Sequence, residues 1–268
     1  YVKQAKAIRA MAVVPRQEFR QMQHRLLHAA RVQPMVRQHL WAVFRAAKAE
    51  FRLRNGMVAV GARVQRALTS IVDLLEDETF DGVPMASAGG FPAFGEPGVR
   101  VIYADASELG FGAWTVIDNV VLCVEGEWDT FENAALPLIC DKELAASNIG
   151  LDALGPEMGF ASGRSERQRF VYEFTDNAVA LGVMRSMTTP SGVMHDLMQW
   201  RIHDLALWDV RSAPERIASK NNKWADWLSR GKLSEVEREA AELGMRVVVV
   251  DCDEARDNMI AWLAASAE

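Results

Sequence analysis

Residues 101–114 decide the fold of this chain, and they read VIYADASELGFGAW. Val101, Tyr103 and Asp105 alternate with their neighbours at a period of two, which predicts a β-strand that carries all three on one face. A Ser and two Gly residues then turn the chain into a second apolar strand over about 112–117. Burying an aspartate on such a face is costly unless something binds it. Asp105 is therefore the first candidate site residue.

Three later segments each place one acidic residue in a comparable setting. They are Glu143 in the first half of a predicted helix, Asp176 at the end of a strand, and Asp226 at the start of a late helix. Taken singly, each has a commoner explanation as a turn, cap or solvated helix residue. Strand ends at one edge of a sheet can converge with a helix that lies across it. We therefore expect Asp105 and these three acids to meet.

Carboxylates crowded together raise one another's pKa values unless a cation lies among them. Oxygen ligands without Cys or His clusters favour Mg²⁺, or Mn²⁺, over zinc. Two such ions about 4 Å apart can activate water and stabilise the leaving oxygen of a phosphodiester. The segment Gly110-Phe111-Gly112 does not open a helix, so it is not a dinucleotide-binding motif.

The predicted elements give a mixed α/β sheet with an antiparallel first half, preceded by basic helices. Strands are predicted over about 99–105, 112–117, 120–124, 169–175, 208–212 and 245–250. Helices are predicted over 16–30, 35–49, 57–76, 137–154, 178–187, 193–207, 222–230, 234–244 and 251–265. The predicted domains are a basic α-helical module over 1–76, a linker over 77–98 rich in Gly and Pro, the α/β domain over 99–231, and a helix–strand–helix appendix over 232–268. The appendix either adds an edge strand or packs beside the sheet.

Composition and charge narrow the function classes. The net charge of −6 divides into +12 over residues 1–70 and −18 over the rest, which suggests a basic surface for a polyanion, although a solvated helical face is the plainer explanation. The three cysteines are an odd number without ligand spacing, which favours an intracellular location, in cytoplasm or nucleus, and argues against zinc. No apolar run reaches membrane-spanning length, so no membrane partner is expected. Because Tyr1 is not an initiator methionine, we expect a piece of a longer protein.

Four motifs in order resemble the ribonuclease H domain of retroelement reverse transcriptases, in particular those of the tyrosine-recombinase (DIRS-like) retrotransposons. The motifs are YADAS at 103–107 with GFGAW at 110–114, KELAA at 142–146, TDNAVA at 175–180, and NKWADWLSR at 222–230. The resemblance covers about residues 99–231. More loosely, the basic helices resemble the thumb and connection region that follows the polymerase palm, and no Tyr-x-Asp-Asp polymerase motif occurs in the chain.

The resemblance implies a ribonuclease H-like mixed sheet flanked by helices. It implies that Asp105, Glu143, Asp176 and Asp226 bind two Mg²⁺ ions and cleave the RNA strand of an RNA–DNA hybrid, leaving a 3′-hydroxyl. It implies an upstream polymerase domain of the same polyprotein as a partner. The implied substrate-binding or supporting polar groups are Ser107, Asn177 and Asn222, for which ordinary turn and cap hydrogen bonds are the alternative.

One departure concerns a histidine that many members carry shortly before the last motif, where it assists product release. Arg216 stands in this stretch, and a guanidinium cannot shuttle a proton at neutral pH. His195 and His203 lie on the preceding predicted helix, where a structural role is expected. The departure leaves open a catalytically weak or inactive module that binds nucleic acid or a partner domain. A strand-transfer or Holliday-junction nuclease on the same fold is a weaker alternative, because the end of the last motif resembles that of ribonuclease H instead.

Overall fold

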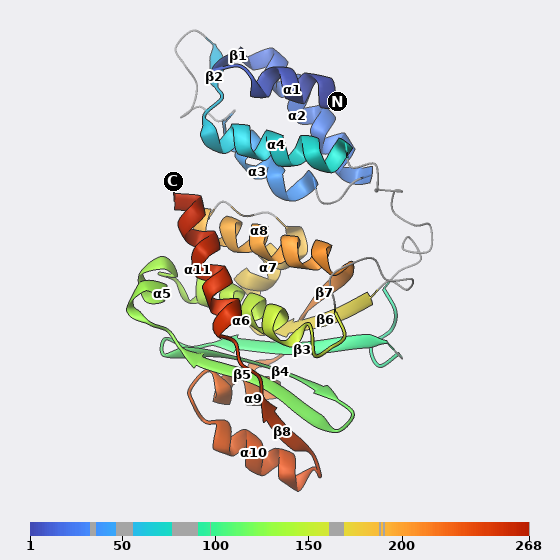
Figure 1. The fold of residues 1–268 in the computed structure, drawn as a ribbon, viewed down its shortest axis with the longest axis vertical. Coiled ribbons are helices and arrows are strands. Elements are labelled where there is room, and N and C mark those ends of the chain that lie inside the picture. The colour runs from blue at the N-terminus through green and yellow to red at the C-terminus, as the bar shows by residue number, and fades with distance from the viewer. Residues whose placement is uncertain are drawn as a thin grey trace. The chain divides into compact units, whose positions relative to one another are not determined.

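The computed structural model describes residues 1–32, 36–46, 56–76, 91–96, 98–160, 169–187, 189 and 191–267. The chain divides into two compact units, Tyr1–Gly90 and Phe91–Glu268, which are described separately (Figure 1). Most of the predicted linker over 77–98 lies outside the described residues, and the predicted four-part division stays a prediction.

The first unit is a helical module with a small ribbon. Its helices are α1 (Val2–Arg9), α2 (Arg16–Val32), α3 (Val36–Ala46) and α4 (Ala62–Glu76). Strand β1 (Val13–Pro15) pairs antiparallel with β2 (Met57–Ala59). The predicted helix over 57–76 therefore begins only at Ala62, because its first residues form β2. The apolar stripes of the helices face one another, and Phe19, Leu68 and Ile71 are fully buried between them.

The second unit is built on a six-stranded sheet. Its strands are β3 (Val99–Ala106), β4 (Gly110–Ile117), β5 (Val120–Glu127), β6 (Arg169–Thr175), β7 (Val210–Arg216) and β8 (Arg246–Val249). They lie in the order β7-β6-β3-β4-β5-β8, and β4 alone runs opposite to the others. An antiparallel meander from β3 to β5, with β6 and β7 added in parallel beside β3, is the ribonuclease H-like topology. The predicted fold class is confirmed.

The meander forms where the sequence predicts it. Asp118 and Asn119 connect β4 to β5 and have φ angles of 49° and 63°. Aspartate and asparagine tolerate this left-handed conformation better than most residues, and a two-residue turn with positive φ at both positions matches the twist of a hairpin. The turn places Ile117 opposite Val120 and so sets the register of the hairpin.

Helices cover both faces of the sheet. They are α5 (Thr130–Ala135), α6 (Ile139–Leu154), α7 (Ala178–Ser186), α8 (Gly192–Leu207), α9 (Lys223–Leu228), α10 (Leu233–Glu242) and α11 (Asp253–Ala267), with a short 3-10 helix over Ser219–Asn221. In Figure 1, α6, α7, α8 and α11 lie on one side of the sheet, and α9 and α10 lie on the other. Helix α5 is too short to show a period and was not predicted, and β7 extends beyond the predicted 208–212.

Two glycines let helices approach the sheet closely. A Cβ on Gly150 of α6 would lie 2.4 Å from the Cβ of Ala113, and a Cβ on Gly112 of β4 would lie 2.3 Å from the Cβ of Leu228. Real side-chain carbons do not approach so closely, so only glycine fits at both positions. The first contact brings α6 close to one face, and the second brings α9 close to the other.

The C-terminal segment extends the sheet. Strand β8 pairs in parallel with β5 and becomes the edge strand, which settles the choice left open by the sequence. Within the described part of the chain, no helix combines the length and the apolar character needed to cross a membrane.

Candidate metal centre

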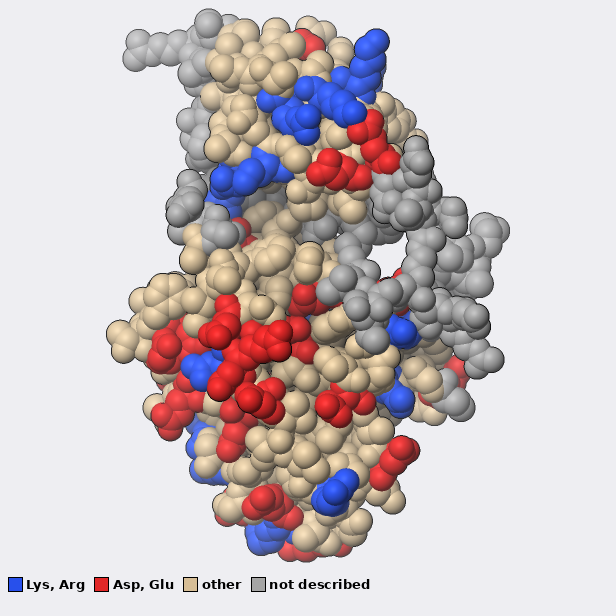
Figure 2. All heavy atoms as spheres, viewed as in Figure 1, with Lys and Arg blue, Asp and Glu red and all other residues tan. Residues whose placement is uncertain are grey.

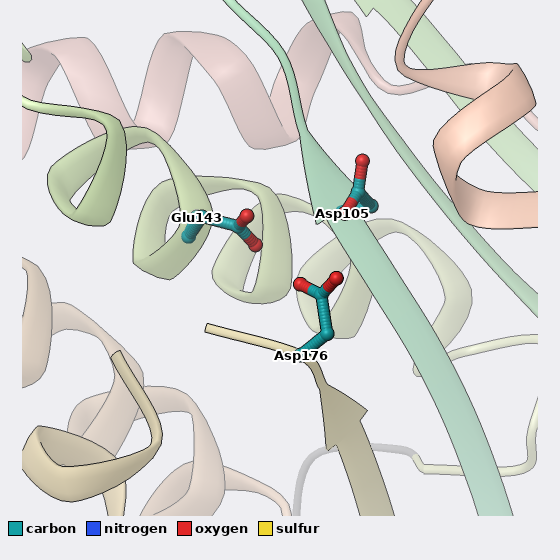
Figure 3. Close-up of side chains that lie close together, drawn as sticks. All are labelled: Asp105, Glu143 and Asp176. Atoms are coloured by element: carbon teal, nitrogen blue, oxygen red, sulfur yellow. The ribbon is translucent and has the colours of Figure 1, made fainter. Parts of the chain in front are cut away.

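Three of the four predicted acids converge at one edge of the sheet. Asp105 lies near the end of β3, Glu143 in the second turn of α6, and Asp176 directly after β6 (Figure 3). Each offers a carboxylate oxygen within 4.8 Å of the others. Because β3 and β6 are parallel neighbours, their carboxyl ends reach the same edge, and α6 lies across it. The architecture thus brings together residues that are far apart in the sequence.

Burial makes this cluster electrostatically unfavourable without a cation. The side chains of Asp105 and Glu143 are buried. Burial raises the pKa of Asp105 from its ordinary 3.8 to about 7, and the charges of Asp176 and Asp226 add to this rise. Burial raises the pKa of Glu143 from 4.5 to about 9, with added repulsion from Asp105 and Asp176. A positive charge among these carboxylates would relieve both penalties.

Glu143 also keeps an oxygen free for a ligand. Its Oε2 atom is buried and has no hydrogen-bond partner, although hydrogen bonds from the Ala106 amide and the Thr175 hydroxyl lower its pKa. A buried carboxylate oxygen without a partner is costly, and coordination to a cation would satisfy it. The donors of the cluster are all carboxylate oxygens, which suit Mg²⁺ or Mn²⁺. The residues present therefore fit such an ion.

A hydrogen bond from Ser229, the residue that follows α9, holds Asp105, and the β3–β4 turn holds Ser229. Its Oδ2 accepts a hydrogen bond from the Ser229 hydroxyl at 2.9 Å. The carbonyl of Ser229 in turn accepts a bond from the Ser107 hydroxyl at 2.6 Å. All three residues are buried. The rotamer of Asp105 is thereby fixed from the side opposite to α6.

The fourth predicted acid is not part of the three-residue cluster. Asp226 lies on α9, near enough to Asp105 to raise its pKa, but its Oδ1 pairs with Arg230 one turn later at 2.8 Å. Both side chains of this pair are more than two-fifths exposed. An exposed i,i+4 pair is worth only about 0.3–0.5 kcal/mol. A modest rearrangement would therefore release Asp226.

The three predicted polar groups make hydrogen bonds within the protein. Ser107 accepts bonds from the amides of Leu109 and Gly110 and so shapes the β3–β4 turn. Asn177 caps α7, with its Oδ1 accepting from the second and third amides of the helix. Asn222 donates from Nδ2 to the carbonyl of Ala104 at 2.9 Å, while its buried Oδ1 has no partner. Their predicted contacts to substrate stay predictions.

Two supporting residues were not singled out from the sequence. Ser229 lies inside the last motif, so its position was visible, but only the fold shows its bond to Asp105. Lys142 is almost fully buried, and its ammonium donates to the carbonyl of Glu108 at 3.2 Å and pairs with the carboxylate of Glu108 at 2.9 Å. It ties the β3–β4 turn to α6 beside Glu143. Lys142 opens the quoted KELAA motif, but the motif does not show that its side chain is buried.

The expected structural roles of His195 and His203 stay predictions. Arg216 ends β7 and is exposed. His195 is buried on α8, and the exposed His203 pairs through Nδ1 with Asp204 on the same helix at 3.2 Å. All three cysteines are free thiols.

Charge is distributed unevenly over the two units. In the view of Figure 2, acidic side chains gather on the second unit over α5 and α11, and basic side chains lie on the first unit. The face of each unit seen in this view is thus consistent with the asymmetry of charge in the sequence.

No protein-family model matches this chain, and no curated protein matches it significantly. Among solved structures, it is similar to a ribonuclease H1 from the halophilic archaeon Halobacterium salinarum NRC-1, with a TM-score of 0.38 and 16% sequence identity. The similarity covers 52% of this chain and 99% of that one. A likeness of this size decides nothing by itself, so the fold assignment rests on the strand order and directions.

Proposed function

We propose that the second unit is a metal-dependent endonuclease that hydrolyses the RNA strand of RNA–DNA hybrids. The observation that carries this proposal is the convergence of Asp105, Glu143 and Asp176 at the carboxyl edge of the sheet, with an unpartnered buried oxygen on Glu143. Burial disfavours the ionised forms of Asp105 and Glu143, and a bound cation would favour them. The ribonuclease H-like sheet and the motif order support the reaction class.

The three carboxylates, with Asp226 as a fourth donor, would hold two Mg²⁺ or Mn²⁺ ions. Such ions, when bound, activate water and stabilise the leaving oxygen of a phosphodiester. The chain's own residues hold this site in shape. Ser229 orients Asp105, and Thr175 and the Ala106 amide orient Glu143. Asp226 lies close enough to Asp105 to raise its pKa, and its ion pair with Arg230 would have to open for it to bind an ion.

The choice of RNA–DNA hybrid rests on the sequence resemblance. Ser107, Asn177 and Asn222 border the cluster on three elements and are the proposed polar contacts or supports for the substrate. The basic first unit supplies positive charge for a nucleic-acid backbone. By the same resemblance, we assign the chain to a retroelement reverse transcriptase polyprotein in which a polymerase domain precedes it.

The test is cleavage of a hybrid in which the RNA and DNA strands carry different labels, with Mg²⁺ or Mn²⁺. We expect cuts in the RNA strand that leave 3′-hydroxyl ends and that disappear in Asp176→Asn. Asp257→Asn, an exposed acid on α11, is the matched control and should cut like the unaltered chain. Cutting that survives Asp176→Asn would place the activity elsewhere and overturn the proposal.

A second candidate function is a module that binds hybrid without cutting it. Two observations favour it: Asp226 lies outside the three-residue cluster, and Arg216 occupies the stretch where a histidine is expected. Tight binding of the hybrid without cleavage, in the presence of Mg²⁺ or of Mn²⁺, would support this function.

A further inference from the structure

A buried ion pair lies beneath the candidate metal centre, between the sheet and α8. Glu173 of β6 and Arg201 of α8 are each about 1% exposed and form a salt bridge. Arg201 also donates to Asn148 of α6 at 3.2 Å and to Ser212 of β7 at 3.1 Å. The Ser147 hydroxyl of α6 donates to the other oxygen of Glu173 at 3.3 Å. One buried pair thus connects two helices and two strands.

Stability alone does not explain such a pair. Removing two charges from water is costly, and well-packed apolar residues of similar volume often stabilise a protein as well or better. The network is, however, well satisfied: both oxygens of Glu173 have partners, and Arg201 reaches three side chains. Geometric specificity is what a directional network of this kind adds to a core.

The position of the network relates it to the metal centre. Glu173 and Thr175 point to the same face of β6, and Glu143 and Ser147 lie one turn apart on α6. Thr175 hydrogen-bonds Glu143, and Glu173 accepts from Ser147. The helix and the strand are therefore connected at two successive points, one of which holds a carboxylate of the cluster. Asp176, another carboxylate of the cluster, directly follows Thr175 in the sequence.

We propose that Glu173 and Arg201 are positioning residues that fix α6 against β6, so that Glu143 and Asp176 meet at the distance a divalent cation needs. This inference rests on the proposed function, because it gives Glu173 and Arg201 a role at the proposed metal centre. Arg201 holds Glu173 from the side of α8 and β7. Glu173 then presents a fixed acceptor to Ser147, which sets the position of α6 along the strand.

The test compares Mn²⁺ affinity, measured by calorimetry, with the melting temperature in EDTA. The double variant Glu173→Met with Arg201→Met removes both charges and leaves no unpaired buried ion. We expect it to fold and to bind Mn²⁺ about tenfold or more weakly, as is typical when groups supporting metal ligands are removed. The Mg²⁺ concentration that half-saturates cleavage should rise by the same factor. An unchanged Mn²⁺ affinity in the folded double variant would overturn the proposal.

A single substitution tests the proposal even if the double variant does not fold. Ser147→Ala removes only the bond between α6 and Glu173. It should weaken Mn²⁺ binding, and it should lower the melting temperature less than removing one charge of the pair would, because only one hydrogen bond of Glu173 is lost. Equal affinity in Ser147→Ala and the unaltered chain would count against the proposal even if the double variant does not fold. Ser147→Thr keeps the hydroxyl and should retain most of the affinity.

The chain offers a matched control pair. Glu132 is also buried and pairs with Arg256 at 2.7 Å, but it joins α5 to α11. Glu132→Gln with Arg256→Met should change stability and leave Mn²⁺ affinity unchanged. If the unaltered chain binds no Mn²⁺, the proposed function fails. If it binds Mn²⁺ and the pair variants bind it equally well, only the positioning role fails.

Discussion

At the scale of single residues, the chemistry of the site depends on two carboxyl groups whose pKa values are raised by burial. Asp105 has a pKa of about 7 and Glu143 of about 9 in the folded chain, well above their ordinary values. At a pH between the ordinary pKa and the raised pKa of each carboxyl group, the folded chain holds a proton that the unfolded chain has released. The free energy of unfolding of the metal-free chain therefore falls as pH rises through this window.

We predict that the metal-free chain loses stability from about pH 4 to pH 7 through Asp105, and that the loss continues to about pH 9 through Glu143. At about 1.4 kcal/mol for each unit of pKa, the two raised values set an upper limit of about 10 kcal/mol on the total loss. Chemical denaturation in EDTA at several pH values measures it. Asp105→Asn and Glu143→Gln should each flatten the curve and stabilise the chain at pH 8. Mg²⁺ should raise the melting temperature most at high pH, because it binds the ionised carboxylates. A pH profile that both substitutions leave unchanged would contradict this account.

The candidate site was largely visible in the sequence as residue types at element ends. Asp105, Glu143 and Asp176 stand at strand and helix positions that periodicity predicts, but each alone has a commoner explanation, and only their joint setting and the order of the motifs singled them out. The pairing of Asp226 with Arg230 was not anticipated, although both residues stand in the quoted motif. The Glu173–Arg201 pair could not be found, because 28 residues separate its members and only the packing of α8 on the sheet joins them.

At the scale of elements, alternation of apolar residues predicted β6 with its observed bounds, Arg169–Thr175. The short elements β1, β2 and α5 contain too few residues for a period to be visible. The closeness of α6 and α9 to the sheet was also hidden, because it depends on what lies opposite Gly150 and Gly112. Long periodic elements are thus predictable from sequence, whereas the contacts between them are not.

The close approach at Gly112 gives a prediction for α9. In Gly112→Ala, the new methyl group would meet Leu228 and the Ser229 amide at 2.3 and 2.7 Å, so α9 must shift. We expect a loss of about 1–3 kcal/mol in stability and weaker metal binding, because Ser229 would no longer hold Asp105. Urea denaturation and Mn²⁺ calorimetry measure the two effects.

Gly182→Ala is the control for that substitution. Gly182 lies within α7, and nothing lies within 4 Å of a Cβ built on it. Alanine there should be neutral or stabilise by up to about 1 kcal/mol, because it favours the helix. If Gly112→Ala behaves like Gly182→Ala, the packing of α9 on β4 does not position Ser229.

At the scale of the whole molecule, the two units differ in charge, and we propose that the basic first unit attracts nucleic acid. Lys3, Arg20 and Arg66 are exposed cations on three helices of this unit. We predict that replacing all three with Gln weakens hybrid binding and makes the logarithm of affinity depend less steeply on the logarithm of salt concentration. The slope should change by about 1 for each phosphate that these cations no longer neutralise. Filter binding at several salt concentrations measures it, and an unchanged slope would show that this surface does not touch the hybrid.

The claim on which the account depends most is that Asp105, Glu143 and Asp176 form a site for divalent metal. Its most direct test is a crystal structure of the chain with Mn²⁺, in which anomalous scattering locates the ion. We predict a peak between the three carboxylates, within coordination distance of Glu143 Oε2, and its loss in Asp176→Asn. An empty cluster at saturating Mn²⁺ and neutral pH would contradict the metal centre and the nuclease function that rests on it.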